Sequence, residues 1–86
     1  MLPREKEKLI LRYRKVVDKL RKAEENSSRP AGSTSLIAVS KTYSAEEVRV
    51  VAEEGQHNFG ENQLQDAMKK IPFLQDLGCI WHFIGP

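Results

Sequence analysis

Apolar and polar residues follow two different periods along this chain. From Pro3 to Glu25 the period is helical, and almost every position outside the apolar stripe is charged. This pattern predicts an amphipathic helix that packs one side against the rest of the molecule. The stripe consists of Leu9, Tyr13, Val16 and Leu20, and it is widened by Ile10 and Val17.

A serine-rich segment that contains Pro30 and Gly32 interrupts the helical pattern. Both residues oppose helix, so residues 27–35 are predicted to form a linker. We therefore expect three parts in the chain. Residues 1–26 form the amphipathic helix, residues 27–35 the linker, and residues 36–86 a part with three strands and two intervening helices.

The three expected strands are Leu36–Ser40, His57–Gly60 and Ile80–Ile84. The first is almost wholly apolar, which is typical of a strand that protein covers on both faces. Strands that alternate with helices of about ten residues predict parallel pairing through right-handed crossovers. The predicted fold class is therefore α/β.

The two intervening helices carry start and stop signals. Ser44 and Glu47 form a capping-box pair, and Gly55 is expected to end that helix. Asn62 is expected to cap the second helix, and Pro72 to end it. The residues expected on the buried sides are Val48, Val51 and Ala52 in the first helix, and Leu64, Ala67, Met68 and Ile71 in the second.

Length and charge limit what the chain can do. A chain of 86 residues forms at most one small domain. The net charge is only +2, but residues 1–26 hold nine Lys or Arg against five Asp or Glu. A basic helix can contact nucleic acid or an anionic membrane. A solvated helix face is favoured, because acidic residues are interspersed and no aromatic ladder accompanies the bases.

Cysteine content and hydropathy favour a reducing compartment. Cys79 is the single cysteine, so no intramolecular disulfide and no cysteine-based zinc cluster can form. The longest apolar run near the N-terminus, Leu9–Leu11, is too short for a signal peptide. No apolar stretch approaches the roughly 18 residues of a membrane span. We expect a cytoplasmic protein with no membrane partner.

Lys41 is the first candidate for covalent chemistry, because it follows directly after the first expected strand. Proteins with α/β folds gather reactive groups at the carboxyl ends of their strands. A lysine forms a Schiff base when its amine is neutral near pH 7, and burial favours the neutral form. The alternative is that Lys41 is an ordinary surface lysine, and the pattern of this strand, taken by itself, favours that alternative.

Three further polar residues lie at or near strand ends. Asn62 could contact a bound group through its amide, or it could only cap a helix. His82 lies within the third strand, where a hydrogen-bonded core histidine is the favoured alternative. Glu61 either makes a hydrogen bond across the strand ends or is the acidic first turn of a helix.

Three segments, in order, are similar to successive blocks of the pyridoxal phosphate homeostasis protein family. They are Leu36–Thr42, Gly55 with His57–Asn62, and Trp81–Pro86, within a resemblance that covers about residues 34–86. One departure is Tyr43–Ser44, where many family members have a basic residue and a proline. Tyr43 either stacks near a cofactor or covers the strand end.

The resemblance implies roles for the candidate residues. It implies that Lys41 holds pyridoxal 5′-phosphate (PLP) as a Schiff base, that Asn62 contacts the cofactor and that His82 lies close to it. It also implies a (β/α)8 TIM-type barrel, like the N-terminal domain of alanine racemase, preceded here by the amphipathic helix. Such barrels typically need about 250 residues, so we expect the N-terminal part of one, as a truncated product or a fragment.

The implied function is PLP homeostasis inside the cell, without turnover of a substrate, and with PLP-dependent apoenzymes as candidate recipients. A racemase-like PLP enzyme is the first alternative. It is disfavoured because Thr42–Ala45 does not match the segment that follows the racemase lysine. The second alternative is an interaction module that uses the charged helix.

Overall fold

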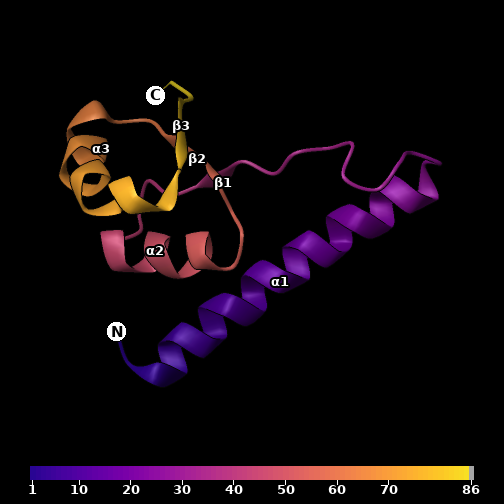
Figure 1. Ribbon diagram of the computed structural model, residues 1–86, viewed down its shortest axis with the longest axis horizontal. Coiled ribbons are helices and arrows are strands. Elements are labelled where there is room, and N and C mark those ends of the chain that lie inside the picture. The colour runs from indigo at the N-terminus through magenta and orange to yellow at the C-terminus, as the bar shows by residue number, and fades with distance from the viewer. Residues whose placement is uncertain (86) are drawn as a thin grey trace.

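The computed structural model describes residues 1–85 (Figure 1). Pro86, the last residue of the third family-like block, lies outside the described residues. The elements follow one another as α1 (Pro3–Asn26), β1 (Ala38–Val39), α2 (Ala45–Glu53), β2 (Asn58–Glu61), α3 (Leu64–Lys70), the 3₁₀ helix η1 (Ile71–Leu77) and β3 (Ile80–Phe83).

The strands form one parallel sheet in the order β1-β2-β3. Ala38 pairs with Phe59, and Phe59 pairs in turn with Trp81. Each strand is connected to the next through a helix, because parallel neighbours cannot be joined by a tight turn. The prediction of an α/β fold with a parallel sheet is confirmed.

One face of this sheet is covered by helices. Phe59, which is 1% exposed, packs there with its ring centroid 5.5 Å from that of Trp81. Burial of these aromatic side chains is the main apolar contribution of the sheet to the core. The buried core side chains are Leu9 of α1, Val48, Val50, Val51 and Ala52 of α2, Phe59 of β2, and Leu74 of η1.

The opposite face of the sheet is open to solvent within residues 1–85. Side chains alternate between the faces of a strand, so Val39, Gly60 and His82, which lie side by side in the register, share this face. A Cβ on Gly60 would lie 3.4 Å from side-chain atoms of both Ile37 and Ile84. Gly60 therefore allows close approach, as expected, and the side chains of both isoleucines lie near it.

Helix α1 lies against α2, and its C-terminal half extends away from the sheet and contacts the segment that follows it, at Thr34 (Figure 1). Leu9 is buried, whereas Val16 is exposed although it belongs to the predicted stripe. Val16 borders an apolar cavity between α1 and the segment around β1, whereas Val17 and Leu20, further along the helix, are half-buried. No helix among the described residues combines the length and the apolar character that a membrane span requires.

Other expectations need correction. The strand predicted at Leu36–Ser40 is paired only over Ala38–Val39, and helices cover only one of its faces. Gln63, not Asn62, is the N-cap of α3, and it makes no side-chain capping bond. Since α3 has only seven residues, it does not bury the whole predicted stripe; Leu64 and Met68 are exposed.

The predicted start and end signals of α2 are confirmed. The Ser44 hydroxyl accepts a hydrogen bond from the Glu47 N–H at 3.2 Å, and the Glu47 carboxylate accepts one from the Ser44 N–H at 3.0 Å. Gly55, with φ of 110°, follows the last residues of the helix. The helix therefore begins and ends where its capping residues predict.

Candidate functional site at the carboxyl end of the sheet

Lys41 lies in a β-turn that follows β1. The turn runs from Ser40 to Tyr43 and is closed by the Tyr43 N–H, which donates to the Ser40 carbonyl at 3.0 Å. Lys41 and Thr42 occupy the two central positions, and both are exposed. The Lys41 side chain is therefore accessible to solvent at the carboxyl end of β1.

Ser40, Glu61 and Lys70 form a buried polar cluster beside this turn. The Ser40 hydroxyl donates to Glu61 Oε2, and Lys70 Nζ lies 3.2 Å from the same oxygen. Lys70 Nζ also donates to the Ser40 carbonyl at 2.5 Å. Glu61 is completely buried, so its negative charge depends on these two partners. The interpretation of Glu61 as a residue that hydrogen-bonds across strand ends is confirmed.

Asn62 and His82 take different positions relative to Lys41. Asn62 directly follows β2, half-buried, at the same end of the sheet as Lys41 because the strands are parallel. His82 lies on the open face, and its Nε2 is 3.0 Å from Oδ1 of Asn58. Among residues 1–85, no hydrogen bond joins Lys41, Asn62 and His82 to one another.

Sequence reasoning missed Lys70 and the role of Ser40. The apolar pattern predicts Ser40 only as the last residue of a strand. Lys70 lies three residues after the buried Ala67 and therefore on the same side of α3. Two sequence features together could have indicated the pair of Glu61 and Lys70. One is a glutamate at the end of a strand, and the other is a lysine on the buried side of the helix that follows.

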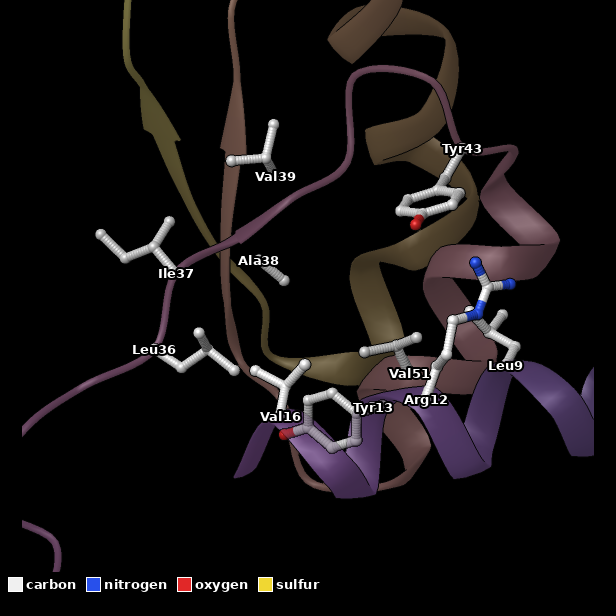
Figure 2. A pocket seen from close by; sticks show the side chains of 10 residues that line it. All are labelled: Leu9, Arg12, Tyr13, Val16, Leu36, Ile37, Ala38, Val39, Tyr43 and Val51. Carbon is white, nitrogen blue, oxygen red and sulfur yellow. The ribbon is translucent and has the colours of Figure 1, made fainter. Parts of the chain in front are cut away.

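An apolar cavity of about 320 Å³ lies between α1 and the segment around β1 (Figure 2). Tyr43 lines it from the β1–α2 connection and packs against the core. This position favours the interpretation that Tyr43 covers the strand end. Lys41, Asn62 and His82 do not line the cavity; its walls are Leu9, Arg12, Tyr13, Val16, Leu36, Ile37, Ala38, Val39, Tyr43 and Val51.

Other reactive groups contribute little at this site. Partial burial raises the pKa of the Cys79 thiol, which reduces its thiolate fraction near neutral pH. Within residues 1–85, no three side chains of His, Cys, Asp or Glu are grouped to hold a metal ion. The chemistry that the site offers is therefore that of an accessible amine with polar neighbours.

Comparison with solved structures places the chain in a class of α/β proteins with a PLP-binding member. The structure of PipY from Synechococcus elongatus, solved with PLP bound, matches with a TM-score of 0.61 and 42% sequence identity. The match covers 77% of this chain and 31% of that chain. No protein-family model matches the chain.

Curated relatives give the family. Pyridoxal phosphate homeostasis proteins of Pseudomonas aeruginosa, Escherichia coli and Aquifex aeolicus are 44%, 40% and 36% identical over 72, 74 and 74 residues. The matches cover 84%, 83% and 86% of this chain. The chain is thus homologous to the pyridoxal phosphate homeostasis protein family, as its sequence blocks predict. It spans about a third of the length of these relatives, 31% of the first and 32% of the other two.

Proposed function

We propose that this chain binds PLP and takes part in its intracellular homeostasis, and that Lys41 holds the cofactor as a Schiff base. The observation that carries the proposal is the accessible lysine at the carboxyl end of β1. Support comes from 42% identity to a structure solved with PLP bound and from relatives named as PLP homeostasis proteins.

The residues present fit one side of a PLP site. Bound PLP supplies an aldehyde that reacts with amines. The chain supplies the Lys41 amine, and Asn62 lies at the same end of the sheet with an amide that can both donate and accept hydrogen bonds. The open face with His82 becomes the interior of a (β/α)8 barrel, since helices cover only the outer face of a barrel sheet.

The proposed role is that of a carrier, not of an enzyme. The relatives are named for homeostasis, and no catalytic base beside Lys41 is needed for holding a cofactor. PLP-dependent apoenzymes in the cytoplasm are the proposed recipients. A racemase-like function instead predicts exchange of the α-proton of an amino acid, so deuterium uptake into alanine in the presence of PLP and the protein would contradict the carrier role.

Trapping of the adduct tests the role of Lys41. The protein is equilibrated with PLP, reduced with borohydride and mapped by peptide mass spectrometry. We expect the adduct mainly on Lys41, and we expect Lys41→Ala to remove most visible absorbance. Lys15, exposed on α1, is the matched control, and Lys15→Ala should change neither result. An adduct spread evenly over the lysines would refute the assignment.

The Asn62→Ala variant tests whether Asn62 contacts the cofactor. Asn62 does not cap α3, so its loss should leave thermal unfolding almost unchanged while PLP binding weakens. A lost hydrogen bond of ordinary strength corresponds to about 0.5–1.5 kcal/mol. PLP titration and thermal unfolding of the same variant separate the two effects. Unchanged PLP affinity would exclude the contact.

A further inference from the structure

We propose that Glu61 and Lys70 are positioning residues for Lys41. Through Ser40, they fix the turn that presents the Lys41 amine at the end of β1. This inference rests on the proposed function, because it concerns the same lysine. It adds two residues to that function, neither of which needs to contact the cofactor.

Each polar group of Ser40 forms at least one hydrogen bond. Its N–H donates to the Gly60 carbonyl at 3.0 Å, and its hydroxyl donates to Glu61. Its carbonyl accepts from Lys70 Nζ at 2.5 Å and from the Tyr43 N–H at 3.0 Å. The residue before Lys41 is therefore tied to β2, to α3 and to the far side of its own turn.

The carbonyl of Ser40 is the acceptor that closes the turn around Lys41. Its direction determines where the peptide of Lys41 points, and Lys70 contacts that same oxygen. Ser40 is 1% exposed, so water cannot easily replace a lost partner. Loss of the pair should therefore change the orientation of the turn as well as its solvation.

The ion pair of Glu61 and Lys70 is better explained by a positioning role than by a contribution to the stability of the fold. The desolvation of two buried charges offsets much of their attraction, so a buried pair is weak evidence for stability. Glu61 and Lys70 are nevertheless both buried, and both form a hydrogen bond with Ser40, the residue before Lys41. Their common target is what indicates a positioning role.

The double variant Glu61→Gln with Lys70→Met tests this role, because it removes both charges and leaves neither one unpaired. Lys69→Met is the matched control, since Lys69 is the exposed neighbour on α3. Two quantities are measured on each folded protein. One is the ratio of borohydride-trapped PLP on Lys41 to that on Lys15. The other is the hydrogen-exchange rate of the Tyr43 amide, which needs no cofactor.

We expect the double variant to lower the Lys41 to Lys15 ratio by about tenfold, since a displacement of about 1 Å can cost 10²-fold in a reaction. The Tyr43 amide should exchange faster, and Lys69→Met should change neither quantity. A folded double variant with an unchanged ratio would overturn the positioning role alone. No preference for Lys41 in the unaltered protein would overturn the proposed function and this inference together.

Ser40→Ala provides the same test if the double variant does not fold. It deletes only the hydroxyl that donates to Glu61. A lower Lys41 to Lys15 ratio at unchanged circular dichroism supports the positioning role, and an unchanged ratio overturns the part of Glu61 in it, because Ser40→Ala removes the bond to Glu61 and keeps the contact of Lys70 with the Ser40 carbonyl. A purely structural role predicts instead a lower melting temperature with the ratio unaffected.

Discussion

At the scale of single residues, Glu24 shows how a carboxylate can be buried near the end of a helix. Glu24 is 2% exposed, and a negative charge near a helix C-terminus is unfavourable. Its carboxylate accepts hydrogen bonds from the Thr34 hydroxyl at 2.5 Å, from the Thr34 N–H at 2.8 Å and from the Gly32 N–H at 3.1 Å. Arg21 Nη1 lies 2.9 Å from it. The linker is thereby fastened to α1.

Acid should loosen this attachment. The Thr34 hydroxyl is the main cause that lowers the pKa of Glu24 from its ordinary value of 4.5 to about 2. The folded state therefore binds the proton less readily than the unfolded state. The contribution of Glu24 to stability is fully present above pH 4.5, and it is lost as the pH falls from 4.5 toward 2.

We predict that Glu24→Gln lowers the melting temperature at pH 7 and makes it less sensitive to pH between 4.5 and 2. Thermal unfolding followed by circular dichroism at several pH values is the measurement. Glu25→Gln is the control, because Glu25 is the exposed neighbour in the same helix. Equal pH dependence in the two variants would mean that Glu24 does not hold the linker.

At the scale of elements, η1 shows how one short helix connects the layers. Leu74 is 2% exposed and belongs to the core, whereas Phe73 beside it is 69% exposed. Arg49 of α2 binds both oxygens of Asp76 at 2.9 Å and the Phe73 carbonyl at 2.6 Å. Helix η1 is therefore attached to α2 by one buried side chain and one exposed ionic contact.

Truncation of Leu74 should destabilise the protein much more than truncation of its neighbour Phe73. Leu74→Ala should lower the free energy of unfolding by about 2–5 kcal/mol, because it removes buried apolar atoms and leaves a cavity. Phe73→Ala should change it by roughly 0.5 kcal/mol or less, as is usual for surface positions. Urea unfolding of both variants gives the comparison. A larger loss for Phe73→Ala would mean that η1 packs with its other side inward.

At the scale of the whole molecule, the sheet has an open face and two unpaired edges within residues 1–85. Ile80 and Phe83 of the edge strand β3 are each 55% exposed. Unpaired edges with apolar side chains are templates for pairing with another chain. The isolated chain is therefore expected to associate with itself through β3 and β1.

This association should depend on protein concentration and on the edge. We predict that Ile80→Lys shifts the sedimentation profile toward the monomer, because a charge on an edge strand opposes strand addition. Leu64→Lys is the control, since Leu64 is similarly exposed but lies on α3. If both variants dissociate the assembly equally, general hydrophobicity drives the association rather than the strand edge.

Local sequence patterns determined the elements of this protein. Helix α1, the capping box of α2 and the order of strands and helices follow from residues close together in the chain, so period and capping rules apply to them directly. The position of Lys41 after the first strand was likewise visible, as were the three blocks that resemble the family. Each of these features depends on neighbours within about a turn or two of chain.

Tertiary structure decided what each element buries and which polar groups meet. Leu64 and Met68 fit an apolar period but are exposed because no neighbouring element covers them, and Val16 is exposed because it borders the cavity between α1 and the segment around β1. Lys70 and Glu61 are nine residues apart, and Ser40 is 30 residues from Lys70, so their meeting depends on sheet register and on the path of α3. Periodicity cannot show such contacts, since it describes one element at a time, whereas burial is a property of two elements together.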